Sequence, residues 1–417
     1  MRGFFVCTGF VRYLFFGSHH LELYSLLIKL LMTPTNQRIV SIDFLRGLTI
    51  ALMIVVNNPG DWGNLFLPFS HAHWNGVTST DLIFPFFIFI VGASIAFSML
   101  SKKASTENHS QLMIKIIKRG IIIFLLGLLK DNFPYMLHTD EGLVFKPLDT
   151  WRIMGVLQRI GLVYLFAGLI FVKTNWKQQV GITVSILLGY WALLQIEIDG
   201  AYILELDKYA GGNIVTYIDY LILGDNHMWQ QIDLDSGRML GWEPEGLLST
   251  LPAIATCLIG VLAGQWIKRE SAILDKISNL FAIGGALTVL ALLWNLTFPF
   301  NKGLWTSSYV LYAGGIALMS SGFCMWLMDY KGYNKVAKPF VIFGSNATVA
   351  YLMAELVASL TWFIQIDGVS LNQTLSGLIK DLIPHPQLAS HTYAFLWMIP
   401  FFLILKWMYN KKIFVKV

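Results

Sequence analysis

Residues 80–101 read TDLIFPFFIFIVGASIAFSMLS, an aspartate followed by an apolar run that meets no further charge before Lys102. About 20 apolar residues are enough for a helix to cross the hydrocarbon core of a bilayer. Lipid offers no partner to backbone N–H and C=O groups, so a spanning chain must pair them within a helix or a closed barrel. The alternation that barrel strands need is absent. The stretch therefore predicts a membrane-spanning helix.

The composition extends this prediction to the whole chain. Of 417 residues, 55% are hydrophobic and 13% are charged, whereas soluble domains average about 25% charged residues. The predicted fold class is all-α, a polytopic integral membrane protein with about ten transmembrane helices. The predicted spans cover residues 41–58, 80–101, 112–130, 153–172, 178–195, 246–267, 277–297, 307–328, 339–363 and 393–410.

Lysine and arginine gather in alternate loops, which predicts the orientation because short basic loops stay on the cytoplasmic side. The loops between them are mostly acidic, including a long one over residues 196–245. Both termini are predicted to be cytoplasmic and residues 70–76 to face outward, with the chain in a bacterial cytoplasmic membrane. The net charge of +5 does not indicate nucleic-acid binding. The basic loops and tail contain Lys102, Lys103, Lys115, Lys118, Arg119, Lys173, Lys177, Lys268, Arg269, Lys276, Lys331, Lys335, Lys338, Lys406, Lys411, Lys412 and Lys416.

Residues 1–37 are predicted to form an N-terminal extension. MTPTNQRIVSIDFLRG, which begins at Met32, has the form of an ordinary bacterial start, so residues 1–31 are attributed to an upstream start codon. A signal peptide or an amphipathic surface segment is the alternative. Cys7, Cys257 and Cys324 are isolated, so neither a disulfide framework nor a Cys/His metal motif is predicted.

Polar side chains at the first span are costly in lipid and indicate either a structural or a functional role. Asp43 and Arg46 lie three residues apart on one helix face, which favours a structural ion pair at the cytoplasmic edge. Asn57 closes the same span. It serves either as a helix cap or as a donor to a developing oxyanion.

The fourth span opens with WRIMGVLQRIG, which contains Arg152, Gln158 and Arg159. A buried guanidinium needs a carboxylate, a phosphate or carbonyl groups. Arg159 is therefore predicted to pair with a carboxylate such as Asp81 or Glu355, or to bind an anionic ligand.

Two further polar pairs lie at later spans. Glu243 and Glu245 precede the sixth span, where carboxylates suit the positive end of the helix dipole. Ser345 and Asn346 lie inside the ninth span, where polar side chains bond across helices. A structural role and a site role remain open for both pairs.

The stretch SHAHWNG before the second span carries the strongest chemical signal. His71 and His73 lack the third ligand that a zinc site needs, and no metal is predicted. Trp74, Asn75 and Asp81 offer an aromatic wall, an amide and a carboxylate nearby. If the turn NGVTST brings Asp81 to His71, the carboxylate fixes the histidine tautomer and raises its basicity. Such a histidine acts as a general base or carries an acyl group.

Several long stretches resemble the transmembrane part of the heparan-α-glucosaminide N-acetyltransferase family. They lie in the same order over roughly residues 38–410, and the family pattern His-Ala-x-Trp-Asn-Gly-x-Thr-x-x-Asp-Leu matches residues 71–82. The animal members have a large lumenal domain before the first span, which this chain is expected to lack. The stretches are SIDFLRGLTIALMIVVNN, HAHWNGVTSTDLIFPFFIFIVGASIAFSM, WRIMGVLQRIGLVY, YIDYLILGDNHMW, PEGLLSTLPAIATCLIGVLAG and NKGLWTSSYVL.

The resemblance implies that residues 38–417 form a transmembrane acyltransferase domain. Acetyl-CoA from the cytoplasm would acetylate a glucosamine-type amine of an amino sugar or glycan on the outer side. His71 is the implied active-site histidine, with Asn57 and Asp81 in the same site, and His73 is the weaker candidate. The predicted partners are this sugar, the bilayer and a second copy of the chain. Predicted substrate contacts are Trp74, Asn75, Glu245, Asn346 and Trp305, and predicted CoA contacts are Arg46, Arg152, Gln158 and Arg159.

Three other functions stay open. An amino-sugar transporter without chemistry is the first, although internal repeats and paired broken helices, which are common in transporters, are not evident. A non-catalytic membrane partner protein is the second. An O-acyltransferase that acts on a polysaccharide hydroxyl is the third and is close to the leading prediction.

Overall fold

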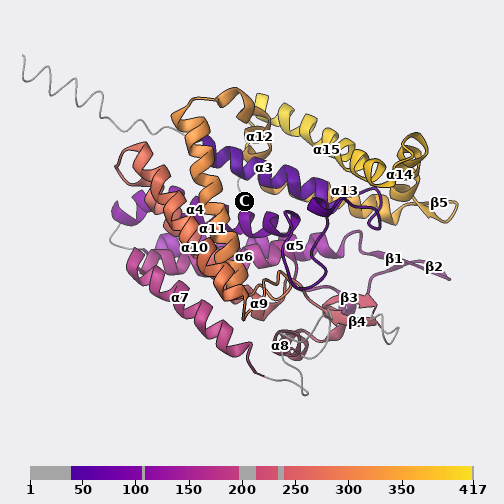
Figure 1. Ribbon diagram of the computed structural model, residues 1–417. Coiled ribbons are helices and arrows are strands. Elements are labelled where there is room, and N and C mark those ends of the chain that lie inside the picture. Colours follow the sequence, from indigo (N-terminus) through magenta and orange to yellow (C-terminus); the bar gives the residue numbers. More distant parts are fainter. Residues whose placement is uncertain (1–38, 106–108, 197–212, 233–238, 416–417) are drawn as a thin grey trace, which may run out of the picture. The chain divides into compact units, whose positions relative to one another are not determined.

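The computed structural model describes residues 39–105, 109–196, 213–232 and 239–415 (Figure 1). Contacts divide the chain after Ile39, and every structural statement below concerns the described part of Val40–Val417. The predicted extension at residues 1–37 lies outside the described residues. Residues 197–212 and 233–238 of the predicted outer loop lie outside them as well.

The predicted all-α class is confirmed, since long helices make up most of the described chain. The only β-structure among the described residues is three short antiparallel hairpins, which pair Met136 with Phe145, Trp229 with Trp242 and Gln365 with Ser370. The helices are α3 (Val40–Asn57), α4 (Ile83–Ser105), α5 (Ser110–Asn132), α6 (Val156–Lys173), α7 (Trp176–Leu193), α8 (Ile214–Leu223), α9 (Leu247–Lys268), α10 (Ile273–Asn295), α11 (Ser307–Cys324), α12 (Asn334–Ser345), α13 (Ala347–Phe363), α14 (Leu371–Leu382) and α15 (Pro386–Asn410).

Short elements connect these helices. The strands are β1 (Met136–Thr139), β2 (Gly142–Phe145), β3 (Trp229–Ile232), β4 (Met239–Trp242), β5 (Gln365–Ile366) and β6 (Val369–Ser370). The single turns are η1 (Leu67–Phe69), η2 (Thr80–Leu82), η3 (Leu148–Thr150) and η5 (Asp225–His227), and η6 (Met325–Tyr330) is a π-helical extension of α11.

Seven helices among the described residues are long and apolar enough to cross a membrane, and the bent pair α12–α13 makes an eighth. The chain is therefore a multi-pass membrane protein. The other two predicted spans are also helical: α5 carries Lys115, Lys118 and Arg119, and α7 starts with a polar turn. Because of these polar residues, neither α5 nor α7 is among the eight candidate membrane spans. The seven are α3, η2–α4, α6, α9, α10, α11–η6 and α15.

The ninth predicted span is not one helix, which corrects the prediction for residues 339–363. The helices α12 and α13 meet at an angle of 69°. Asn346 at the break leaves the helical region with φ −132° and ψ 47°. Its side chain bonds the C-terminal tail, donating to the Ile413 carbonyl at 2.9 Å and accepting from the Val415 N–H at 2.9 Å. These bonds stabilise the break because they pair an amide that would otherwise face an apolar helix.

Glycine residues let the backbones of α4 and α9 come into direct contact. A Cβ atom at Gly260 would lie 2.0 Å from the Phe89 carbonyl oxygen, and one at Gly92 would lie 2.0 Å from the Cys257 carbonyl oxygen. No side chain fits at either position. The pair α4–α9 therefore forms a tightly packed centre against which α6, α7 and α11 also pack.

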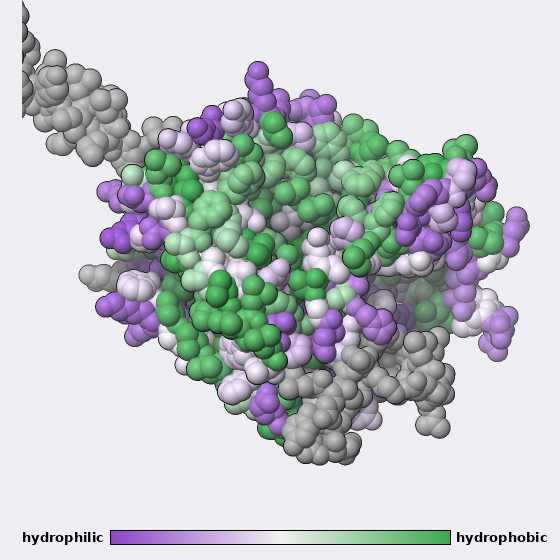
Figure 2. Space-filling model, viewed as in Figure 1, coloured by the Kyte–Doolittle hydropathy of each residue, from purple (hydrophilic) through white to green (hydrophobic). Residues whose placement is uncertain are grey.

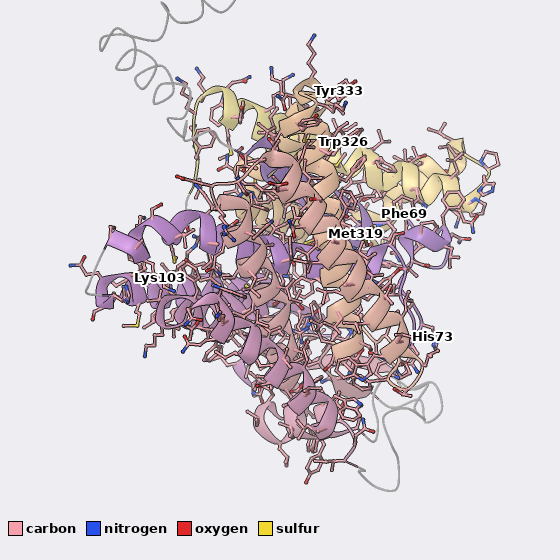
Figure 3. All side chains as sticks on the ribbon, turned by 60° about the vertical axis from the view of Figure 1, so that its left-hand side comes forward. Phe69, His73, Lys103, Met319, Trp326 and Tyr333 are labelled. Carbon is pink, nitrogen blue, oxygen red and sulfur yellow. The ribbon has the colours of Figure 1, made fainter. Side chains whose placement is uncertain are left out.

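The loops meet at two opposite ends of the helices. At one end, Ser41 bonds Asp329 and the Lys103 ammonium donates to the Phe171 carbonyl, both at 2.5 Å. At the other end, the Asn57 amide donates to Glu355 at 3.0 Å. We call these the basic end, which holds Lys103, and the histidine end, which holds His71. Figure 3 shows Lys103 and His73 on opposite sides of the view. Figure 2 shows apolar side chains over α10 and α11, with hydrophilic ones toward the margins.

Replacing Gly260 by Ala is expected to destabilise the protein, because the added methyl group meets the Phe89 carbonyl. Overpacking of this kind costs about 1–3 kcal/mol. The melting temperature in detergent measures the effect. Gly189→Ala in α7 is the matched control, since its Cβ meets nothing within 4 Å. Equal melting temperatures for both variants would show that the α4–α9 contact is looser than described.

Candidate active site

A cavity of about 420 Å³ lies at the histidine end, within the size range of small-molecule sites. Its wall combines the end of α3, the start of α4, the start of α6, the β3–β4 hairpin and the loop before α11. We call it the histidine cavity. Its lining residues are Met53, Val56, Asn57, His71, Ala72, His73, Trp74, Thr80, Asp81, Ile83, Phe84, Arg152, Val156, Trp229, Trp242, Pro244, Glu245, Lys302, Gly303 and Trp305.

Asp81 organises the turn that presents His71. Its side chain is 1% exposed, and its Oδ1 atom lies 2.6 Å from His71 Nδ1. Its Oδ2 atom accepts from the backbone N–H groups of Ala72 and Thr78, both at 3.0 Å. The Thr78 hydroxyl donates to the Ser70 carbonyl at 2.6 Å and closes the turn. A contact between Asp81 and His71 was expected from the sequence, and the structure brings the two side chains together.

The hydrogen bond to Asp81 sets the tautomer of His71. A carboxylate only accepts hydrogen bonds, so the Nδ1 atom carries the proton and the Nε2 atom keeps its lone pair. The His71 side chain is 45% exposed, so Nε2 is accessible. An imidazole with this arrangement can accept a proton or attack a carbonyl carbon.

Asn57 lines the same cavity and belongs to a buried polar network. Its Nδ2 atom donates to Glu355 Oε1 at 3.0 Å. Lys130 lies 3.6 Å from Glu355 and 2.5 Å from Asp131. Glu355 therefore pairs with Asn57 and Lys130, and not with Arg159 as one prediction had it. One amide hydrogen of Asn57 is left for a ligand.

The predicted substrate contacts divide into three groups. Trp74, Trp305 and Glu245 line the histidine cavity. Asn75 lies beside it and accepts from the Asn301 side chain at 3.2 Å. Asn346 is not part of this cavity, because it binds the C-terminal tail at the basic end.

Arg152 lies in the histidine cavity, far along the chain from its two partners. Its guanidinium contacts Glu243 at 2.5 Å and Glu245 at 2.9 Å, and it stacks 5.0 Å from the Trp229 ring. Burial alone would lower the pKa of Arg152, but the two carboxylates raise it above its ordinary value. Arg152 was predicted to bind CoA from the cytoplasmic side. The structure instead places it at the opposite end from Arg46, engaged with two carboxylates.

Arg159 and Gln158 lie behind the cavity wall. Arg159 is fully buried, with Nη2 on the Ser249 hydroxyl and its guanidinium 5.0 Å from the Trp305 ring. Within the described residues, its Nε and Nη1 atoms have no hydrogen-bond partner. Gln158 donates to Asp131 at 2.8 Å. Neither residue lines the histidine cavity, so their predicted contact with CoA stays a prediction.

Asp219 on α8 caps the start of α9 near Arg159. Its Oδ1 atom accepts from the N–H groups of Leu247 and Leu248 at 2.9 and 3.1 Å. Burial raises the pKa of Asp219 to about 6, although these two N–H groups and the Arg159 charge oppose the shift.

A second cavity of about 240 Å³ lies toward the basic end and includes Arg46. Arg46 contacts Asp43 at 2.5 Å, which is the ion pair that the sequence favoured, and donates to the Gly344 carbonyl at 2.8 Å. We call this the arginine cavity, because Arg119 also lines it. Met53 and Val156 line both cavities, so a single layer of side chains separates them.

Three residues that line the histidine cavity were not predicted as site residues from the sequence: Lys302, Trp229 and Trp242. Lys302 had a signal: it is a lysine on the side where the charge rule places few lysines, within the stretch NKGLWTSSYVL. The two tryptophans had none, because the residues between them are a hairpin whose pairing is not encoded by a strong local pattern.

Known proteins are similar to this chain in sequence. A profile of the heparan-alpha-glucosaminide N-acetyltransferase catalytic region matches residues 38–223. The heparan-alpha-glucosaminide N-acetyltransferases of Homo sapiens and Mus musculus are 30% and 28% identical to this chain, over 76% and 77% of its length. The chain is similar to this family over about three quarters of its length. It spans about half the length of these two relatives, 53% and 54%.

Replacing Asp219 by Asn should remove a pH dependence of stability. The folded pKa lies above the unfolded value, so the folded state binds the proton more tightly. Wild-type stability should therefore fall as the pH rises from about 4 to about 6, by up to about 3 kcal/mol. Melting temperatures of both proteins across this range measure the difference. Asp149→Asn, at an exposed carboxylate, is the control, and parallel curves for Asp219→Asn and wild type would contradict the prediction.

Proposed function

We propose that the chain is a transmembrane acetyltransferase that moves an acetyl group from acetyl-CoA at the basic end to an amino sugar at the histidine end. The observation that carries this proposal is the His71–Asp81 pair, whose accessible Nε2 atom faces a tryptophan-lined cavity. The relatives are named for N-acetylation of a glucosaminide, which supports an amine as the acceptor.

The donor is proposed to enter from the arginine cavity. CoA carries several phosphate charges, which guanidinium groups bind well. Arg46 and Arg119 line this cavity, and Arg119 lies 4.9 Å from the Tyr164 ring. The loops at this end are the lysine-rich ones, so the charge rule places it in the cytoplasm. The thioester would then reach His71 past Met53 and Val156.

The chemistry follows from the position of Nε2. In direct transfer, the sugar amine attacks the thioester carbonyl, its proton passes to Nε2, and the C–S bond breaks to release the CoA thiolate, which takes that proton. In the two-step route, Nε2 itself attacks the thioester carbonyl and the C–S bond breaks to release the thiolate. The amine then displaces the acetyl group from the ring, and its proton passes to the freed Nε2 atom and on to the thiolate. The Asp81 carboxylate stabilises the positive charge that the imidazole carries in either route.

One observation favours transport as the second candidate. Cavities toward both ends and a helix pair broken at Asn346 are features that secondary transporters use. An imidazole beside a buried carboxylate also serves in the proton relays of transporters, so the product assay has to separate the two functions. Uptake of an amino sugar into liposomes without acetylated product would favour transport.

Replacing His71 by Ala should abolish acetyl transfer from labelled acetyl-CoA to glucosamine. General acid–base catalysis contributes about 10²–10⁴-fold, so the turnover number should fall by at least that factor. Product is scored with purified protein in detergent. The control is His138→Ala, an exposed histidine of the β1–β2 hairpin that does not line the cavity. A His71→Ala variant that keeps wild-type turnover would exclude the proposed role.

Replacing Val156 by Trp should separate CoA binding from transfer. The larger side chain fills the layer shared by the two cavities, so the acetyl group no longer reaches His71 while the arginine cavity still binds CoA. Calorimetry with CoA and the product assay measure the two effects. The matched control is Val180→Trp on an exposed face of α7. Unchanged turnover in Val156→Trp would show that the donor takes another path.

A further inference from the structure

Besides Asp81, a second charged side chain, Lys302, lies against the ring of His71. Its Nζ atom is 3.1 Å from Nδ1 and 3.5 Å from Nε2, and 3.7 Å from Asp81 Oδ1. Its side chain is 27% exposed, which is low for a lysine in a loop. The ammonium therefore lies over the edge of the ring that joins both nitrogens, nearer to Nδ1 and 3.5 Å from Nε2, where the proposed chemistry occurs.

The loop that carries Lys302 is fixed to the turn that carries His71. The Gly76 N–H donates to the Phe300 carbonyl at 2.8 Å, and the Asn301 amide donates to Asn75 at 3.2 Å. Within the loop, Asn301 Oδ1 accepts from the Leu304 N–H at 2.9 Å. These bonds hold the backbone on both sides of Lys302, so its position beside His71 is built into the fold.

The backbone of this loop is also unusual. Trp305 adopts a φ of 53°, in the left-handed region that large side chains rarely occupy. Such conformations persist where the surrounding structure enforces them and gather at functional sites. Here the conformation lets Trp305 line the cavity while Lys302, three residues earlier, faces His71.

The charges around Lys302 are mixed. Burial lowers the pKa of Lys302, and the Arg159 charge acts in the same direction. Asp81 and Glu245 oppose this shift and favour the ammonium form. Lys302 thus lies 3.7 Å from the Asp81 carboxylate and lines the same cavity as Glu245.

We propose that Lys302 is a catalytic residue that stabilises the oxyanion formed on the acetyl group at His71. This proposal rests on the acetyl transfer proposed above. Attack on the carbonyl carbon moves the π electron pair onto oxygen, and the pair returns when the C–S bond breaks and the thiolate leaves. An acetyl carbon at Nε2 has its oxygen one bond away, within hydrogen-bond reach of an ammonium 3.5 Å from that nitrogen. A fixed donor at a developing oxyanion needs no reorganisation during the reaction.

Lys302 complements Asn57, which the sequence predicted as the oxyanion donor. The Asn57 amide already donates to Glu355, so only one hydrogen remains for a substrate. A neutral amide also gives a weaker hydrogen bond to an oxyanion than a cation does. The structure therefore assigns the larger share of oxyanion stabilisation to Lys302.

The test compares Lys302→Met and Lys302→Arg with wild type in the full-length protein. Methionine keeps much of the length without charge, and arginine keeps the charge. Turnover and KM for acetyl-CoA and glucosamine are measured across a pH range, and melting temperature and CoA binding check the fold. Lys146→Met is the matched control, since Lys146 bonds Asn132 outside the cavity lining.

We expect Lys302→Met to lose about 10²–10³-fold in turnover at every pH, with both KM values little changed. Lys302→Arg should recover at least a tenth of the wild-type turnover and keeps the test valid if the methionine variant does not fold. Two results would overturn the proposal: a turnover plateau that is intact and only shifted in pH, or a loss confined to KM. Absence of product from wild type would overturn the proposed function, whereas a loss only in the variants concerns Lys302 alone.

Discussion

The buried carboxylate of Asp81 connects the parts of the molecule that form the candidate site. Its two side-chain oxygens bind His71 and the N–H groups of Ala72 and Thr78, and its backbone carbonyl accepts the Tyr309 hydroxyl. It therefore joins the turn, the start of α4 and the start of α11. An unpaired buried carboxylate is very costly, so the turn has to fold around it, and the orientation of His71 follows from that requirement.

Charged groups elsewhere at the histidine end follow the same rule. Lys130 lies between Asp131 and Glu355, and Arg152 lies between Glu243 and Glu245. A charge inside a membrane protein is tolerated when it is paired or faces a polar cavity. Both of these clusters are at the histidine end, and each touches a residue that lines the histidine cavity. Buried ion pairs add little to stability over apolar packing. The clusters are therefore better explained as part of the polar wall of the histidine cavity.

Much of the fold could be predicted from the sequence because lipid restricts a spanning chain to helices. Nine of the ten spans predicted from apolar length are single helices, and the ninth span along the chain is the bent pair α12–α13. The break at Asn346 was not predictable, because the tail that stabilises it lies 67 residues further along the chain. The same limit applies to the site. His71 and Asp81 are ten residues apart and were recognised together, whereas Lys302 reaches His71 from 231 residues away. The partners of Arg152 could not be predicted, because Glu243 and Glu245 lie 91 and 93 residues further along the chain.

The two cavities constrain how a donor and an acceptor on opposite sides could react. CoA is too highly charged to cross an apolar layer. Either the protein opens to one side of the membrane at a time, or the thioester arm of CoA extends through the layer between the two cavities. Because Met53 and Val156 line both cavities, only one layer of side chains lies between them. Rotamer changes in such a layer are much smaller than the rocking of helix bundles in transporters. The glycine contacts between α4 and α9 also oppose large relative movement, since their backbones are already in contact. For an acetyltransferase of this architecture, reach through a narrow layer is therefore the simpler route, and His71 lies where that route ends.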